Sequence, residues 1–194
     1  MSRAFILGNG ITRLQVNLNT LKECGPVYGC NAIYREFTPD VLISTDRPIS
    51  ERIQNEGYSL KNRMYTRKPI PGSGAIRVSQ TYYGFSSGPL AVAQAALDGN
   101  VALYMIGFDM GPINGKFNNV YSDTEFYKKS SAPPTFTGNW VRQVVQICKD
   151  FNDRRFFRVK GDVTTDVPEL QKITNLVHLP MADFLDRINN TKDL

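Results

Sequence analysis

Short runs of apolar residues recur along the chain, separated by polar segments and by segments that contain glycine or proline. Seven of these runs predict strands, at residues 4–7, 27–30, 41–45, 75–78, 101–106, 156–159 and 176–179. Most of the runs are continuous rather than alternating, which is typical of strands that are covered on both faces. The pattern therefore predicts an interior sheet with helices on its two sides.

Three segments have helical patterns. Segment 137–151 has apolar residues at helical spacing and predicts an amphipathic helix. Segment 86–99 is apolar nearly all round between residues 90 and 97, so its helix has to be buried; Ser87 is the candidate cap and Gly99 the candidate stop. Segment 180–188 has apolar residues at helical spacing again and predicts a last amphipathic helix.

Strands that alternate with helices predict an α/β fold: a Rossmann-like, mostly parallel sheet with helices on both faces. A length of 194 residues fits a single domain over residues 1–194. Residues 109–136 contain Gly, Pro, Asn, Tyr and Lys without periodicity and predict a long loop. Within that loop, aromatic and basic side chains are candidates to close over a ligand, namely Tyr121, Tyr127, Lys128 and Lys129.

Composition narrows the class of protein. No apolar stretch approaches the roughly 20 residues of a membrane span, and the first residues lack a secretory signal, so we expect a cytoplasmic protein. Three cysteines without a CxxC pair predict reduced thiols rather than disulfides or a zinc site. The net charge of +5 favours an anionic partner. Because the basic residues are dispersed, that partner is expected to be a phosphate-bearing small molecule rather than nucleic acid.

Polar residues follow several of the predicted strands. Parallel strands present their carboxyl ends at one edge of a sheet, where ligands bind. The strand ends supply the glycine segment 8–10, then Asn31, Asp46 and Asp109. The sequence therefore predicts one polar site built from four separate strand ends.

The segment "GNG" at residues 8–10 has two interpretations. Glycines allow positive φ and let backbone N–H groups approach a phosphate closely, which favours a ligand loop. The same residues also form tight turns. The dinucleotide fingerprint GxGxxG is absent, because Arg13 occupies the position of its third glycine. The residues alone leave both interpretations open.

Two stretches resemble a known superfamily. "ILGNG" followed by "GCNAIYREFTPDVLISTDRP", and later "GFSSGPLAVAQAALDGNVALYMIGFDM", are similar in order and spacing to motifs of two groups. These are the Campylobacter-type CMP-sialic-acid sialyltransferases and the archaeal-type hydroxymethylpterin pyrophosphokinase-like proteins. The resemblance spans roughly residues 4 to 110. Family GNGPS appears here as "GNGIT", which keeps a hydroxyl at Thr12 and loses the proline.

The resemblance implies a nucleotide site and a transferase. The positions that match the motifs and would contact the nucleotide are Gly8, Asn9, Gly10, Thr12, Asn31, Asp46, Ser87 and Gly88. The pterin-type relatives imply that Asp46 is a ligand of Mg²⁺. The sialyltransferases imply a nucleotide-sugar donor, CMP-linked, that binds without a metal.

The chain departs from the sialyltransferase pattern at the general base. Those enzymes use a histidine after the Gly-x-Asp strand, whereas the single histidine here is His178, in an apolar run that favours a structural role. By residue type, Asp109 and Asp123 are the candidate catalytic bases.

Three hypotheses follow for function. The first is glycosyl transfer from a nucleotide-activated sugar to a small-molecule or glycan acceptor. The second is Mg²⁺-dependent pyrophosphoryl or phosphoryl transfer. The third is a nucleotide-binding protein without catalysis. The sequence does not determine the oligomeric state, and a homo-oligomer is one possibility. A fold this compact would suit a protein encoded by a phage.

Overall fold

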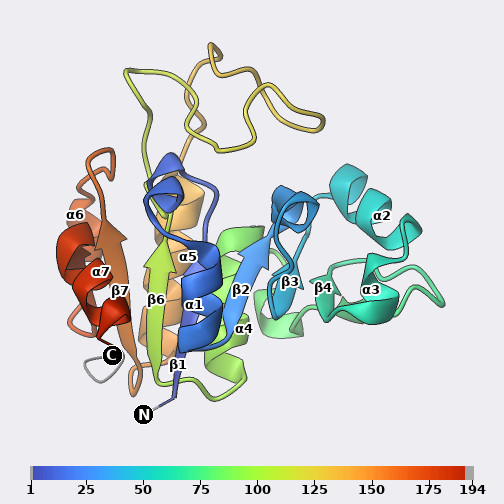
Figure 1. The fold of residues 1–194 in the computed structure, drawn as a ribbon, viewed down its shortest axis with the longest axis horizontal. Helices are drawn as coiled ribbons and strands as arrows, with labels where there is room; N and C mark the ends of the chain where they lie inside the picture. The colour runs from blue at the N-terminus through green and yellow to red at the C-terminus, as the bar shows by residue number, and fades with distance from the viewer. Residues whose placement is uncertain (1, 191–194) are drawn as a thin grey trace.

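The computed structural model describes residues 2–190 and contains one eight-stranded sheet (Figure 1). Its order is β5-β4-β3-β2-β1-β6-β7-β8, and every neighbouring pair is parallel. The strands are β1 (Arg3–Leu7), β2 (Val27–Cys30), β3 (Val41–Ile43), β4 (Met64–Thr66), β5 (Ile76–Arg77), β6 (Ala102–Ile106), β7 (Arg155–Lys160) and β8 (Leu176–Pro180). The predicted parallel α/β fold is confirmed.

The continuous apolar strands are explained by burial on both faces. Successive side chains of a strand point to opposite faces. In β1, Ala4 and Ile6 belong to one hydrophobic cluster, whereas Phe5 and Leu7 belong to the other. A strand that contributes to both clusters requires apolar residues at every position, so an alternating pattern does not occur.

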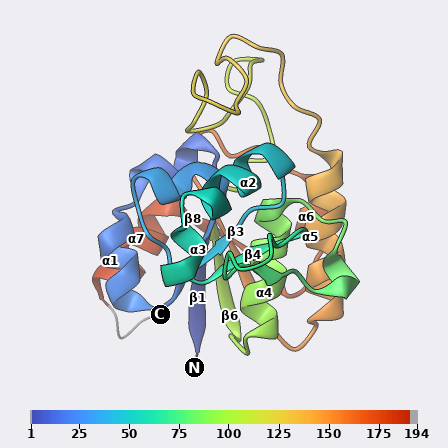
Figure 2. The ribbon, with the colours of Figure 1, turned by 90° about the vertical axis from the view of Figure 1, so that its right-hand side faces the viewer.

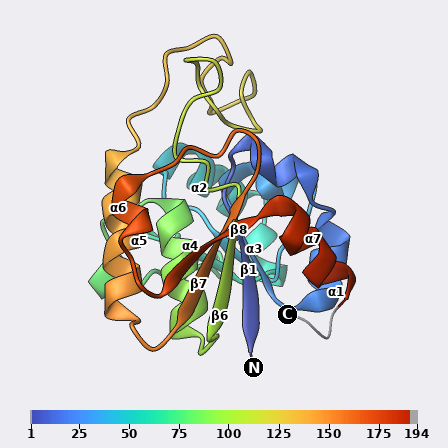
Figure 3. The ribbon, with the colours of Figure 1, turned by 90° about the vertical axis from the view of Figure 1, so that its left-hand side faces the viewer.

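Helices cover the two faces, as Figures 2 and 3 show from opposite sides. Packed on one cluster are α4 (Ser87–Leu97), α5 (Gly138–Asp150) and α6 (Pro168–Gln171). On the other lie α1 (Leu18–Cys24), α2 (Arg47–Asn55), α3 (Tyr58–Lys61) and α7 (Met181–Asn189). Short 3-10 helices complete the fold, namely η1 (Ile11–Gln15), η2 (Asn31–Arg35) and η3 (Gln80–Tyr82). No helix within residues 2–190 combines the length and apolarity that a membrane crossing needs.

Element boundaries differ from the sequence predictions in a few places. The prediction missed β4, because its three residues stand among polar neighbours. It also missed α2, whose apolar residues Ile49 and Ile53 are separated by one polar and two charged residues. Helix α4 begins at Ser87, so the N-cap position is Ser86 rather than Ser87. The Ser87 hydroxyl is used instead in tertiary hydrogen bonds.

The strand order places a topological switch point between β1 and β6. From β1 the chain builds the sheet outward to β5, and it then returns to β6 on the other side. Loops that leave the carboxyl ends of two such strands diverge and leave a crevice where ligands bind in open α/β sheets. The long connection from β6 to α5 lies beyond this end of the sheet (Figure 1). The predicted long loop is confirmed.

Candidate functional site

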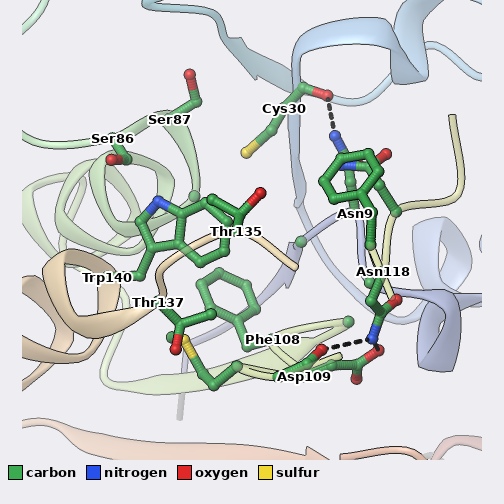
Figure 4. A pocket seen from close by; sticks show the side chains of 18 of the residues that line it. Asn9, Cys30, Ser86, Ser87, Phe108, Asp109, Asn118, Thr135, Thr137 and Trp140 are labelled. Carbon is green, nitrogen blue, oxygen red and sulfur yellow. Dashed lines mark hydrogen bonds between the residues drawn. The ribbon is translucent and has the colours of Figure 1, made fainter. Parts of the chain in front are cut away.

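A cavity of about 290 Å³ lies at the carboxyl ends of β1, β2, β3 and β6, beneath the long loop (Figure 4). It is close to the lower limit of ~300 Å³ for small-molecule pockets. The structure brings most of the predicted site residues to this cavity, where the lining includes Gly8, Asn9, Gly10, Asn31, Asp46, Ser87, Gly88 and Asp109. The edge of the sheet predicted from the sequence is therefore the edge that contains the cavity.

The glycine turn, residues 8–10, uses its backbone for internal hydrogen bonds. The N–H of Gly8 donates to the Ile106 carbonyl at 2.8 Å, and the N–H of Gly10 donates to the Gly107 carbonyl at 3.0 Å. In the residues that follow, the Thr12 N–H donates to the Asp109 carboxylate at 3.2 Å. Backbone donors that are already bonded are not available to a phosphate. Two of the three N–H groups of the turn, those of Gly8 and Gly10, are therefore not available to a phosphate.

Close approach of two loops explains why this turn contains glycine. A Cβ added at Gly8 would lie 2.6 Å from the Gly107 carbonyl oxygen. A Cβ at Gly10 would lie 2.7 Å from the same oxygen and would collide with the Asp109 carboxylate. Gly107 itself has φ +77°. Of the two interpretations of "GNG", the structure thus favours the packed turn.

Asn9 lies between this turn and the end of β2. Its Oδ1 accepts from Arg13 at 3.0 Å, and its Nδ2 donates to the Cys30 carbonyl at 3.3 Å, the bond drawn in Figure 4. Arg13 is only 2% exposed and also donates to Glu36 and to the Tyr121 hydroxyl, both at 3.0 Å. The Asn9 side chain thus forms part of the wall while its amide is engaged in the fold.

Asp109 is buried and its carboxylate is engaged as well. Its Oδ2 accepts from the Thr12 N–H and, at 3.0 Å, from the side-chain amide of Asn118, while its Oδ1 faces the Thr164 hydroxyl at 3.4 Å. Figure 4 shows the Asn118 bond at the rim of the cavity. These contacts fasten the glycine turn, β6 and the long loop to one another. As a predicted catalytic base, Asp109 has few lone pairs left for a substrate.

The Arg158 side chain, on β7, stabilises the backbone around Asp109. It is 1% exposed and donates to the carbonyls of Phe108, Thr165 and Asp109 at 2.8 to 3.0 Å. Burial lowers the pKa of Arg158 to about 10, which leaves it charged at neutral pH. The neighbouring Arg155 is exposed on the same strand. Of these two arginines on β7, Arg158 is therefore in the interior and Arg155 at the surface.

The start of α4 differs from the glycine turn because it keeps free donors. The Ser86 N–H donates to Gln143 at 2.9 Å. Within residues 2–190, however, the N–H groups of Ser87 and Gly88 have no acceptor, and the Ser86 hydroxyl has no partner. All three residues line the cavity. The positive end of the helix dipole lies at the same place, so this end of the cavity favours an anion.

Asn31 adds a donor to the helix start. Its Oδ1 accepts from the hydroxyls of Ser44 at 3.0 Å and Ser87 at 3.2 Å. Its Nδ2 is left without an acceptor in the described part of the chain, and the residue lines the cavity. Asn31 has φ 51°, a left-handed conformation that asparagine adopts more readily than most residues. Ser87, which also accepts from the Thr45 N–H at 3.0 Å, holds this side chain in place.

Asp46 is the exposed carboxylate at the cavity. It precedes α2, its carbonyl accepts from the Ser50 N–H at 2.9 Å, and its carboxylate has no hydrogen bond within residues 2–190. In that range no group of three His, Cys, Asp or Glu residues is placed to hold a metal ion. Because the Asp109 oxygens are already engaged, the surroundings of Asp46 do not fit a Mg²⁺ site. The predicted role as a metal ligand has no support.

Two of the predicted site residues lie elsewhere. Thr12 lies in η1, beneath the glycine turn, and is 1% exposed. Its hydroxyl oxygen lies 3.3 Å from that of Thr164. Asp123 stands on the exposed loop and accepts from Ser130, whose hydrogen bonds lower the pKa of this carboxyl. Neither residue lines the cavity. The structure therefore does not bring Thr12, predicted as a nucleotide contact, or Asp123, predicted as a base, together with the other predicted site residues.

The remaining ionisable candidates do not supply a base. His178 lies on β8 outside the cavity lining, and burial lowers the pKa of its imidazole. Cys30 lines the cavity, but burial raises the pKa of its thiol to about 12, so it stays protonated at neutral pH. All three cysteines are free and buried, consistent with reduced thiols.

The long loop contributes residues that the sequence did not single out. The predicted contacts, Tyr121 and Tyr127, turn their hydroxyls toward Glu36 (2.7 Å) and the Ala32 N–H (3.5 Å). The loop residues that line the cavity include Phe117, Asn118, Asn119, Pro134, Thr135 and Thr137, and Trp140 joins them from the first turn of α5. An irregular loop has no period from which such contacts can be predicted.

Comparison with known proteins supports the α/β fold described above. No family model matches the chain, and no curated protein matches it. The chain is similar to a solved structure of the sialyltransferase CstII from Campylobacter jejuni in complex with a substrate analogue, cytidine-5′-monophosphate. The similarity covers 94% of this chain and 87% of that chain, with a TM-score of 0.58 and 11% sequence identity. The chain thus has a sialyltransferase-like α/β fold.

Proposed function

We propose that the chain is one nucleotide-binding domain whose cavity holds a nucleotide-activated sugar, with the phosphate at the helix start, residues 86–88. One observation carries the proposal: the N–H groups of Ser87 and Gly88 and the amide of Asn31, which have no acceptor within residues 2–190, converge on a cavity at the switch point of the sheet. Charge-assisted hydrogen bonds from such donors to a phosphate are stronger than neutral ones.

The charge of the cavity favours a monophosphate over a triphosphate. Among the lining residues that the structure describes there is no lysine or arginine, and Asp46 adds a negative charge. Nucleoside triphosphate sites bring a lysine and a divalent cation to the phosphates. A phosphodiester of the CMP-sugar type has one charge, which backbone and amide donors can balance. The similarity to a fold solved with cytidine-5′-monophosphate supports the same choice.

For the reaction we propose glycosyl transfer with Asp46 as the proton acceptor. The hydroxyl oxygen of an acceptor, a small molecule or a glycan, attacks the anomeric carbon of the donor sugar. The bond from that carbon to the phosphate oxygen breaks, and the nucleoside monophosphate leaves with the electron pair. The acceptor proton passes to the Asp46 carboxylate, which no residue of the described chain occupies.

A ligand panel tests the binding. Thermal unfolding is followed with CMP, UDP and ATP, each with and without Mg²⁺. A ligand at ~100 times its Kd stabilises the native state by about 2.7 kcal/mol, so a bound nucleotide raises the melting temperature. We expect CMP to do so without metal. Stabilisation by ATP that requires Mg²⁺ would support phosphoryl transfer instead, and no response to any nucleotide would refute the proposal.

A second candidate is nucleotide binding without catalysis. It is favoured by the lining itself, in which no histidine occurs and the Asp109 carboxylate is engaged. Product formation from a CMP-sugar separates the two candidates. If Asp46→Asn abolishes turnover but keeps CMP binding, Asp46 has a catalytic role. If the unaltered protein binds CMP-sugar tightly and neither transfers nor hydrolyses it, the result supports nucleotide binding without catalysis.

A further inference from the structure

We propose that the apolar side of the cavity is a subsite for the nucleobase, and that Trp140 is its stacking residue. This inference rests on the proposed nucleotide site and deepens it. The helix start holds donors for a phosphate, whereas much of the remaining lining is apolar or aromatic, with Phe108, Met110, Pro112, Phe117, Pro134 and Trp140. A nucleoside monophosphate has the same division, with an anion at one end and a flat ring at the other.

Phe108 forms a floor next to the phosphate end. It is 6% exposed. A Cβ at Gly8 would lie 3.0 Å from its ring, and one at Gly88 would lie 3.5 Å from it. The ring is therefore enclosed between the glycine turn and the start of α4. A buried ring of this kind shapes the cavity and excludes water, but it exposes little face to a ligand.

Trp140 is more accessible and stands on the adjacent wall. It lies in the first turn of α5, is only partly buried, and packs its covered side against the core beneath α4 and α5. Figure 4 shows its indole nitrogen on the side of Ser86 and Ser87. The indole N–H has no hydrogen-bond acceptor in residues 2–190, so a ligand can provide one. A partly exposed indole next to an anion site is well suited to a base that carries a phosphate.

The apolar and aromatic side chains that line the cavity favour a nucleobase over a sugar at this position. A sugar placed against these side chains would leave its hydroxyls without partners, which is costly. A planar base instead stacks on an aromatic ring, and such stacking accepts any base because every base has a π-face. We therefore expect CMP and UMP to bind with similar affinity, and ribose 5-phosphate, which has the phosphate without the base, to bind more weakly.

Trp140 also reports on its own contact, because the chain contains a single tryptophan. Fluorescence excited where tyrosine does not absorb comes from this residue alone. We expect CMP to quench it in a saturable titration, and ribose 5-phosphate at a saturating concentration to leave it nearly unchanged. Calorimetry measures the affinity of both ligands independently of the fluorophore.

Three variants test the stacking by calorimetry. Trp140→Leu removes the aromatic face, and a loss of ~10-fold in CMP affinity is expected from the usual strength of base stacking. Its affinity for ribose 5-phosphate is expected to stay unchanged. Trp140→Phe restores a ring and is expected to recover most of the CMP affinity. Phe136→Leu is the matched control, because Phe136 is 74% exposed nearby and does not line the cavity.

The outcomes separate this inference from the function on which it rests. If CMP binds without quenching, or if Trp140→Leu weakens CMP and ribose 5-phosphate equally, the base subsite is wrong and the phosphate site stands. If neither CMP nor ribose 5-phosphate binds to the unaltered protein, both proposals are wrong. Circular dichroism and melting of the Trp140→Leu variant show whether it is folded, and the Trp140→Phe variant repeats the test with a smaller change.

Discussion

The glycine turn and the helix start line the same cavity and differ in how their hydrogen-bonding groups are used. At the glycine turn, Gly8 and Gly10 donate to carbonyls of the fold, and the Asn9 amide is engaged on both sides. At the helix start, the N–H groups of Ser87 and Gly88 have no acceptor in residues 2–190. At the glycine turn, most of the hydrogen-bonding groups connect parts of the fold, whereas the helix start keeps two neighbouring backbone donors for a ligand.

The difference shows that a glycine motif after a strand is not by itself a phosphate site. Glycines permit close approach of backbone, and in this protein the approaching group is the Gly107 carbonyl. The donors that remain for a ligand belong to a helix whose first turn cannot bond internally. If this division is correct, changes at the turn reduce stability and changes at the helix start reduce binding.

The largest effect is expected beneath the glycine turn, at Arg158. Arg158→Met keeps the bulk of the side chain but removes the donors to three carbonyls, those of Phe108 and Asp109 in buried bonds and that of Thr165 in a partly buried one. We expect the free energy of unfolding to fall by about 4 kcal/mol, since each buried group without a partner costs ~1–3 kcal/mol. Urea unfolding measures it. Arg155→Met on the same strand is the control, because Arg155 is exposed, and it should change stability by about 0.5 kcal/mol or less.

A somewhat smaller loss is expected within the turn. Gly10→Ala places a methyl group 2.7 Å from the Gly107 carbonyl oxygen and against the Asp109 carboxylate, so one of the two loops has to move. We expect a loss of about 3 kcal/mol in the free energy of unfolding. Gly84→Ala is the matched control, because a Cβ there meets no atom within 4 Å. Equal stability of the two variants would contradict the packing explanation.

Near the helix start, the expected effect is on affinity. Asn31→Asp keeps an oxygen for Ser44 and Ser87 and tolerates the left-handed backbone, but it replaces the free amide with a negative charge. We expect CMP affinity to fall by ~10-fold or more, because a charged hydrogen bond of ~1.5–3 kcal/mol is lost. Calorimetry measures this. Asn152→Asp adds the same charge at an exposed turn and should leave binding unchanged; a similar loss there would show a general charge effect.

The smallest expected effect concerns His178, which belongs to neither region. Burial lowers the pKa of the His178 imidazole in the folded state below the ordinary 6.5. The imidazole therefore binds a proton more tightly in the unfolded chain than in the folded chain. The stability from the neutral imidazole is present above pH 6.5 and is lost as the pH falls below it. His178→Gln removes this contribution, so its stability should fall less between pH 7.5 and pH 5.5. Parallel pH dependences of the two proteins would rule out this role for His178.

The sequence determined the fold and the edge of the sheet at which the cavity lies. Continuous apolar strands such as β1 and β6, alternating with helices, require a buried parallel sheet, and strand direction then places Asn31, Asp46 and Asp109 at one edge. These conclusions depend on local pattern and chain direction alone.

Tertiary structure decided which groups at that edge remain free. Gly8, Asn9 and Asp109 match a binding motif by type, but each has a hydrogen bond to a residue in a distant part of the chain, namely Ile106, Cys30 and Thr12 respectively. Trp140 fits an ordinary helix stripe in the sequence, yet its place in the first turn of α5 brings it to the cavity. Whether a donor is free depends on partners far away in sequence, and these become neighbours only when the chain folds.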